Sequence, residues 1–246
     1  MPAASANGAL FIVGLGPGDP DLMTLKAARV IAETAVIAFF AKTGKRGHAR
    51  GIVEGRLNPT AEELCFEYPF TTELSVDHPR YLAEMGDFYE ACAEAVAARL
   101  RDGRDVALLC EGDPFFYGSA MYLFDRLAEA YRAEVIPGVT GMSGCWARAG
   151  TPIAHGDDVL SVLPGTLDGP SLVSRLSHCD AAVIMKVGRN LPKIRRALTE
   201  AGLADRAILV ERGTMGDERI TPLSGVADGP APYFSLVLVP GRRHPR

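Results

Sequence analysis

The chain has 246 residues, of which 48% are hydrophobic and 23% charged, with a formal net charge of −4. This composition is typical of a folded globular protein with one large domain or two ordinary ones, and it argues against a disordered or fibrous chain. The negative charge argues against general attraction to nucleic acids or anionic membranes, so an acidic ligand would need local basic side chains. The longest apolar run, residues 35–41, is far shorter than the about 20 residues that span a bilayer. The first ten residues lack a leader pattern, and we therefore expect a cytoplasmic protein.

The first predicted elements are a strand at residues 9–13, a glycine-rich loop at 14–20 and a helix at 24–34. Such a loop can bring backbone amides close to a nucleotide, as in the dinucleotide-binding fingerprint. However, Asp19 occupies the third glycine position of that pattern. The loop is therefore as consistent with a structural turn as with a ligand site, and a nicotinamide-dependent dehydrogenase is one alternative function.

A second buried strand is predicted at residues 35–41, and the basic segment KTGKRGHAR, residues 42–50, follows it. Runs of charge usually face water, but this segment is also suited to a polyanion. The apolar residues of 78–101 recur at three- and four-residue steps, which predicts a long amphipathic helix.

The chain is organised around LLCEGDPFFYGS, residues 108–119, which follows a predicted strand at 105–110. Asp113 and Pro114 have the pattern of a helix N-cap followed by a proline at the first helical position. Gly112 and Gly118 would allow a ligand to approach the backbone closely. The next predicted helix covers residues 120–131.

The second half contains a strand at 134–136, a PGVTG turn and a helix at 142–149, then strands at 159–163, 182–185, 206–211 and 233–239. Asn190 and Gly202 are the predicted start and end of a further helix. This alternation predicts an α/β protein of two domains, the first with a largely parallel sheet and the second with a mixed sheet. We place the boundary near Asp113–Tyr117, giving domains 1–114 and 115–246.

Five cysteines are scattered along the chain without CxxC or Cys/His ligand spacing: Cys65, Cys92, Cys110, Cys145 and Cys179. We expect them to be reduced, apolar side chains and expect no metal site.

Five segments occur in order along the chain: GLGPGDPDLMTLKA, LCEGDPFFYGS, VIPGVTGMSG, IMKVGRN and ERGTMGDERI. Together they resemble the tetrapyrrole methylase family of S-adenosylmethionine-dependent enzymes, over almost the whole chain. The segments DDVLSVLPGT, VIMKVGRNLPKIR, VERGTMGDERI and PYFSLVLV resemble the branch that methylates precorrin-2 at the C(20) meso carbon in cobalamin biosynthesis. The resemblance implies a homodimer of two α/β domains, with S-adenosylmethionine bound in the cleft between the domains of each chain and no metal.

The resemblance also assigns roles to residues by their place in the motifs. Glu111 departs from the pattern, because many relatives have glycine there. The implied cofactor contacts are Pro17, Gly112, Asp113, Phe116, Thr140, Gly141, Met185 and Gly213. Because precorrin-2 carries eight carboxylates, its implied contacts are basic side chains and the first glycine loop: Gly14, Gly16, Lys42, Lys45, Arg46, His48, Lys186 and Arg189.

Methylation of the macrocycle releases a proton, and Asp113 and Tyr117 are the predicted catalytic acceptors. Several alternatives stay open at this point. The substrate could contain cobalt, or the enzyme could methylate uroporphyrinogen III or a later precorrin. The alternative that is not an enzyme is a noncatalytic tetrapyrrole carrier.

Overall fold

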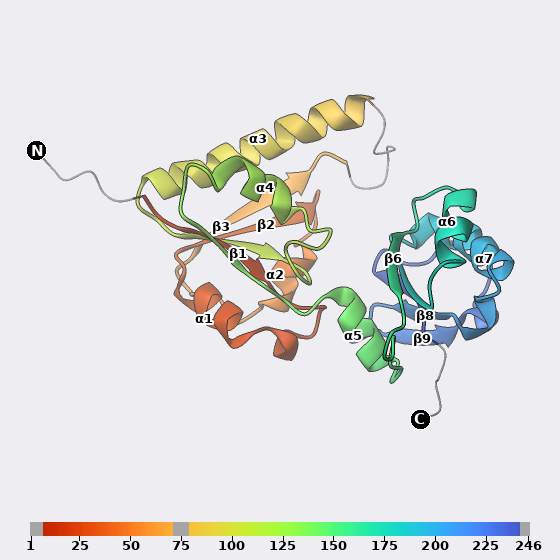
Figure 1. Cartoon of the computed structure of the whole chain (residues 1–246). Helices are drawn as coiled ribbons and strands as arrows, with labels where there is room; N and C mark the ends of the chain where they lie inside the picture. Colours follow the sequence, from red (N-terminus) through yellow and green to blue (C-terminus); the bar gives the residue numbers. More distant parts are fainter. Residues whose placement is uncertain (1–6, 71–78, 242–246) are drawn as a thin grey trace, which may run out of the picture. The chain divides into compact units, whose positions relative to one another are not determined.

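The computed structural model describes residues 7–70 and 79–241, which fall into two compact units that divide between Thr140 and Gly141 (Figure 1). The sequence predicted a division after residue 114. The structure places it later because the segment after residue 114 supplies a helix and a strand of the first unit, and that strand pairs with the first strand of the chain. No helix among the described residues is both long and apolar enough to cross a membrane.

The first unit contains a five-stranded sheet in which every strand pair is parallel, in the order β3-β2-β4-β1-β5. Parallel strands bring their carboxyl ends to one edge of the sheet, where α/β proteins bind ligands. The strands are β1 (Leu10–Gly14), β2 (Val36–Lys42), β3 (Glu62–Tyr68), β4 (Val106–Cys110) and β5 (Ala133–Ile136).

Helices cover both faces of this sheet (Figure 1). The long helix α3 (Pro79–Arg101) and α4 (Ala120–Leu127) pack on one face, and α1 (Leu25–Glu33) and α2 (His48–Ile52) pack on the other. Of the apolar stripe of α3 predicted from its spacing, Met85, Cys92, Val96 and Leu100 are buried, and Tyr81 and Phe88 are half-buried. The predicted start of α3 at His78 lies outside the described residues.

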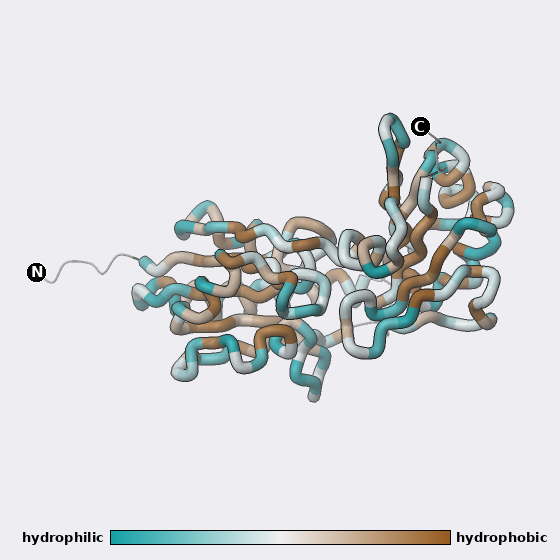
Figure 2. The backbone as a smooth tube through the Cα atoms, turned by 90° about the horizontal axis from the view of Figure 1, so that it is seen from below, coloured by the Kyte–Doolittle hydropathy of each residue, from teal (hydrophilic) through white to brown (hydrophobic). Residues whose placement is uncertain are grey.

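The second unit has a mixed five-stranded sheet in the order β6-β7-β10-β8-β9. Its strands are β6 (Leu160–Pro164), β7 (Ala181–Met185), β8 (Ile208–Glu211), β9 (Arg219–Pro222) and β10 (Ser235–Val239). Helices α6 (Gly169–Leu176) and α7 (Leu191–Glu200) cover one face, and α5 (Gly141–Arg148) covers the other. In each unit the hydrophobic stretches follow the strands and the hydrophilic ones follow the connections (Figure 2).

The predicted α/β architecture, parallel in the first half and mixed in the second, is confirmed. The predictions omitted α2, β3, α6 and β9. Strand β3 alternates between half-buried and exposed positions at the edge of its sheet, so its sequence lacks the continuous apolar run of a central strand. No regular structure was predicted for the basic segment, but its first residue ends β2 and its last three residues begin α2.

The predicted helix cap at Asp113 is wrong, because α4 begins at Ala120 and residues 113–118 form turns. Asn190 also makes no side-chain cap for α7. Its amide Nδ2 instead donates to the carbonyl oxygen of Lys186 at 3.0 Å. The predicted helix end at Gly202 is confirmed by its left-handed φ of 70°.

Candidate functional site

Three glycines meet at the carboxyl edge of the first sheet, where β1, β4 and β5 end. A Cβ atom added to Gly14 would lie 2.6 Å from the Gly138 nitrogen and 2.9 Å from the Gly112 carbonyl oxygen. One added to Gly138 would overlap the Gly112 carbonyl oxygen. Backbone therefore packs directly on backbone at this edge, and a side chain at Gly14 or Gly138 would force the three turns apart.

Gly16 and Gly112 join the first loop to the central motif. They form an antiparallel bridge in which the Gly112 N–H donates to the Gly16 carbonyl at 2.7 Å and the Gly16 N–H donates back at 3.3 Å. Both glycines have left-handed φ values, of 82° and 67°, which side chains disfavour. Pro17 is buried directly after this bridge. The structure thus brings Gly14, Gly16, Pro17 and Gly112 together.

Asp113 ties two turns of this edge together. Its Oδ1 accepts a hydrogen bond from the Phe115 N–H at 2.9 Å, and its Oδ2 accepts one from the Gly138 N–H at 3.1 Å. Hydrogen bonds to an ionised carboxylate are stronger than those between neutral groups. The carboxylate therefore organises its own turn and anchors the PGVTG turn that leads to Thr140.

Aromatic side chains follow Asp113. Phe116 is half-buried, and the half-exposed ring of Tyr117 packs edge-on against it with 5.0 Å between ring centroids. Tyr117 has a left-handed φ of 57°, which is uncommon for a residue with a bulky side chain. Backbone strain of this kind costs of order 1–3 kcal/mol and clusters at functional sites.

The basic segment is attached to the same edge through Glu111. Its Oε1 accepts a hydrogen bond from the Ala49 N–H at 2.9 Å, at the first turn of α2. Two basic residues of the segment are paired with acids: Arg46 with Glu54, and Arg50 with Glu63 through two 2.8 Å hydrogen bonds. The pairing raises the pKa of Arg50, and Glu63 in turn has a lowered pKa because Arg50 donates to it.

The other predicted basic residues of the segment, Lys42, Lys45 and His48, have exposed side chains. Lys42 ends β2, which runs parallel to β4, so Lys42 lies at the same carboxyl edge of the first sheet as the central motif. The segment is therefore divided: Arg46 and Arg50 form ion pairs, and Lys42 lies at the carboxyl edge of the sheet.

In the second unit, Met185 ends β7 and is half-buried, and the exposed Lys186 follows with a left-handed φ of 54°. The Lys186 backbone is fixed by the side chain of Asn190, as described above. Arg189, in the 3-10 helix Gly188–Asn190, is exposed. These three predicted residues are thus grouped on one connection.

Gly213 lies on the turn between β8 and β9 and is buried. A Cβ atom added there would lie 2.6 Å from the Cys145 sulfur on α5. Burial raises the pKa of that thiol to about 12. Because β10 pairs antiparallel with both β7 and β8, the carboxyl ends of those two strands share one edge, which brings the Met185 and Gly213 connections to the same side of the second sheet.

The predicted residues therefore form two groups, one at the carboxyl edge of each sheet. Thr140 and Gly141 are half-buried and lie at the junction of the units. Four non-glycine residues in the described part of the chain have positive φ, namely Tyr117, Lys186, Arg212 and Thr214, and all four lie in the five motifs. Sequence reasoning missed the anchoring of Glu111 on α2 and the role of Cys145 beneath Gly213, because neither contact has a local sequence signal.

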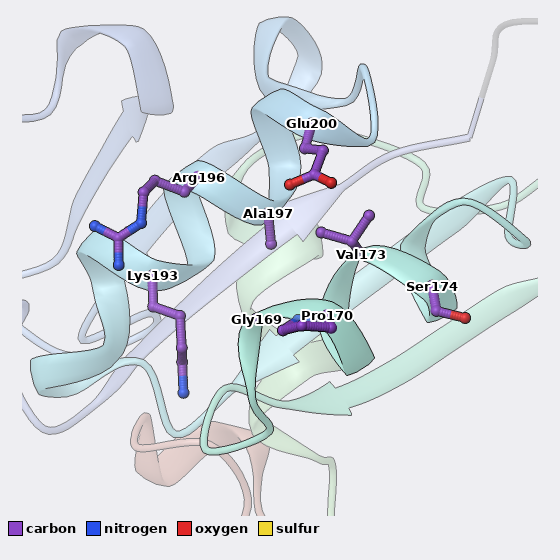
Figure 3. Close-up of a pocket in the computed structure, with 8 residues that line it drawn as sticks. All are labelled: Gly169, Pro170, Val173, Ser174, Lys193, Arg196, Ala197 and Glu200. Atoms are coloured by element: carbon purple, nitrogen blue, oxygen red, sulfur yellow. The ribbon is translucent and has the colours of Figure 1, made fainter.

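A groove of about 560 Å³ between α6 and α7 is separate from these groups (Figure 3). It is lined by charged side chains, including Lys193, Arg196 and Glu200, and by none of the predicted site residues. Burial lowers the pKa of Lys193. We therefore do not assign the groove to the functional site.

The fold is that of an α/β protein with two units. Each sheet carries glycine-rich and strained turns at its carboxyl edge, where α/β proteins bind ligands. The chain belongs to the tetrapyrrole (corrin/porphyrin) methylase family, whose model matches residues 9–226.

Individual relatives agree with this membership. A precorrin-2 C(20)-methyltransferase from Sinorhizobium sp is 57% identical over 234 residues, which cover 95% of this chain and 96% of that protein. A cobalt-precorrin-2 C(20)-methyltransferase from Salmonella typhimurium is 31% identical and covers 95% and 96% of the two chains. The solved structure of a uroporphyrin-III C-methyltransferase from Thermus thermophilus, complexed with S-adenosylhomocysteine, has the same fold, with a TM-score of 0.66, 22% identity and coverage of 95% and 92%.

Proposed function

We propose that this protein is an S-adenosylmethionine-dependent C-methyltransferase that methylates precorrin-2 at C(20), giving precorrin-3A in cobalamin biosynthesis. The observation that carries the proposal is the 57% identity to a precorrin-2 C(20)-methyltransferase along nearly the full length of both chains. The relative that acts on the cobalt-containing substrate is only 31% identical over a similar length. The metal-free substrate is therefore the one we assign.

S-adenosylmethionine is the cofactor that family membership supports, and when bound it supplies a methyl group already activated on a sulfonium. The described residues fit such a ligand in that the turns at Gly14, Gly112 and Gly138 pack backbone on backbone, which holds the carboxyl edge of the first sheet in one shape. We propose cofactor contacts at Pro17, Gly112, Asp113, Phe116, Thr140, Gly141, Met185 and Gly213. The protein's task is then orientation, which can contribute roughly 7 to 11 kcal/mol to a transfer reaction.

For the substrate carboxylates we propose contacts from Lys42, Lys45, His48, Lys186 and Arg189, which are exposed. Arg46 can contribute only if it leaves its ion pair with Glu54. We also propose substrate contacts from the backbone of Gly14 and Gly16. Exposed ammonium and guanidinium groups form charge-assisted hydrogen bonds with carboxylates, and their number suits a polyanionic substrate.

The contacts suggest different roles for the two predicted catalytic residues. Both carboxylate oxygens of Asp113 already accept hydrogen bonds from backbone N–H groups, so we assign Asp113 to holding the cofactor turns in place. The half-exposed Tyr117, held in a strained backbone conformation, is the proposed relay for the departing proton: its hydroxyl oxygen would accept that proton as its own proton passes to solvent. We also infer that the enzyme acts as a homodimer, which a measurement of native mass against the 26.2 kDa chain would test.

The deciding experiment supplies the purified protein with S-adenosylmethionine carrying an isotopic methyl label, together with one tetrapyrrole at a time. We expect label in precorrin-2, and NMR of the product should place the new methyl at C(20). Cobalt-precorrin-2 and uroporphyrinogen III are the matched comparisons. Faster labelling of either comparison would overturn the substrate assignment, and binding of precorrin-2 without turnover would indicate a carrier.

A further inference from the structure

The turn between β8 and β9, residues 212–218, has a constrained backbone around buried Gly213. Arg212 and Thr214, on either side of the glycine, both have left-handed φ values, of 50° and 70°. Residues other than glycine keep such values only where surrounding contacts hold them. The contacts that hold this turn are therefore part of what gives Gly213 its position.

Three hydrogen bonds fix the first half of the turn. The Arg212 N–H donates to the Phe234 carbonyl at 2.7 Å, and the Met215 N–H donates to the Arg212 carbonyl at 2.9 Å. The third comes from a side chain: Glu218 Oε2 accepts from the Thr214 N–H at 2.7 Å. Glu218 is thus the acidic side chain that reaches back across the turn to the residue following Gly213.

Glu218 is itself held by Arg148, at the C-terminal end of α5. The Arg148 Nε lies 2.9 and 3.0 Å from the two carboxylate oxygens, and Nη2 lies 2.9 Å from Oε1. The Glu218 side chain is only 13% exposed, and its pKa is lowered chiefly by the hydrogen bonds from Arg148. The carboxylate therefore stays ionised and fixed in direction.

Helix α5 also contacts this turn directly. The Cys145 sulfur fills the space where a Gly213 side chain would lie, and Arg148 is one turn further along the helix. The backbone of residues 212–214 is therefore set by α5 through two separate contacts. Backbone N–H and C=O groups give specificity in a small-molecule site only when their directions are fixed.

We propose that Glu218, oriented by Arg148, is a positioning residue that fixes the backbone of residues 212–214 for binding the cofactor. The inference rests on the proposed function, because it takes Gly213 to be a cofactor contact. It adds a residue that none of the predicted contacts included. It also assigns α5 the role of an internal support for the cofactor turn.

Calorimetric titration of the full chain with S-adenosylhomocysteine tests the proposal. Glu218→Ala should raise the Kd about tenfold, which corresponds to about 1.4 kcal/mol. Glu218→Gln should recover part of this loss, because its amide oxygen can still accept from Thr214. The double variant Glu218→Ala/Arg148→Ala should bind no more weakly than Glu218→Ala, because Arg148 acts through Glu218. The matched control is Glu90→Ala, which removes a Glu–Arg pair on α3 and α4 and should bind like wild type.

Two further readouts separate positioning from a general loss of structure. Glu218→Ala should raise KM for S-adenosylmethionine. It should leave unchanged both kcat at saturating cofactor and KM for the tetrapyrrole. The backbone amide of Thr214 should exchange hydrogen faster in this variant than in wild type. If wild type fails to bind S-adenosylhomocysteine, the proposed function fails. If wild type binds and Glu218→Ala binds equally well, the positioning role is overturned. Should Glu218→Ala not fold, unchanged affinity in both Glu218→Gln and Arg148→Ala overturns it instead.

Discussion

The packing of backbone on backbone at the first sheet edge gives a sharp prediction for Gly14→Ala. The added methyl carbon would lie 2.6 Å from the Gly138 nitrogen and 2.9 Å from the Gly112 oxygen, whereas ordinary contacts begin at 3.4 Å. Neither neighbour is a flexible side chain, so two turns must each shift by several tenths of an ångström. Overpacking of this kind costs typically 1–3 kcal/mol.

The shift would also weaken two hydrogen bonds in the same place. The Gly138 N–H is held by Asp113, and the Gly112 carbonyl accepts from Gly16. Each such bond contributes about 1 kcal/mol. We therefore expect Gly14→Ala to lower the free energy of unfolding by about 2–4 kcal/mol and to weaken binding of S-adenosylhomocysteine at least tenfold.

Urea denaturation followed by circular dichroism measures the first effect, and hydrogen exchange of β1, β4 and β5 locates it. The matched control is Gly86→Ala, within α3, where an added Cβ would meet nothing within 4 Å. Replacing a helix glycine by alanine should stabilise the protein by about 0.5–1 kcal/mol. Wild-type stability and affinity in Gly14→Ala would refute the claim that close backbone contact organises this edge.

Two more predictions concern charged groups of the first unit. Asp113→Ala should lower the free energy of unfolding by about 2–3 kcal/mol, because it removes the acceptors of the Phe115 and Gly138 backbone amides. Asp113→Asn should keep one of these hydrogen bonds and lose about half as much stability. Equal stability of both variants and wild type in urea would contradict this. The pKa of Glu62 lies below its ordinary value of 4.5 because Arg99, and then Arg104, donate hydrogen bonds to its carboxylate. The stability that ionised Glu62 contributes is therefore present above about pH 4.5 and is lost as pH falls through the lowered pKa. Thermal melts between pH 3 and 7 should therefore show a flatter acid profile for Glu62→Gln, and an unchanged profile would rule out this contribution.

The kind of architecture and the place of the important turns can be read from the amino-acid sequence. Buried strands such as 105–110 follow from continuous apolar runs, and the amphipathic helix ending at residue 101 follows from its spacing, because hydrophobic burial leaves a pattern in the chain. The five motifs also contain every non-glycine residue with positive φ among those described. Turn chemistry is local, so a sequence records it directly.

Elements with a weak local signal escaped prediction. Strand β3, EELCFEY, has only three consecutive apolar residues between glutamates, and α2 is only five residues long. Both are stabilised by partners distant in the sequence: β3 pairs with β2, and α2 is anchored at Ala49 by Glu111. Intrinsic preference cannot decide such segments, because tertiary contacts outweigh it.

Asp113 shows most clearly how contacts between distant parts of the chain set the role of a residue. Its sequence context, Asp followed by Pro, is that of a helix cap, and the chain does turn there. The folded protein instead uses its second oxygen to hold Gly138, which lies 25 residues further along the chain. The first unit accordingly extends through β5 to Thr140, because pairing of β5 with β1 closes the sheet after the central motif. The residues of the turn determine that it forms, whereas strand pairing between distant parts of the chain determines which residues the turn contacts.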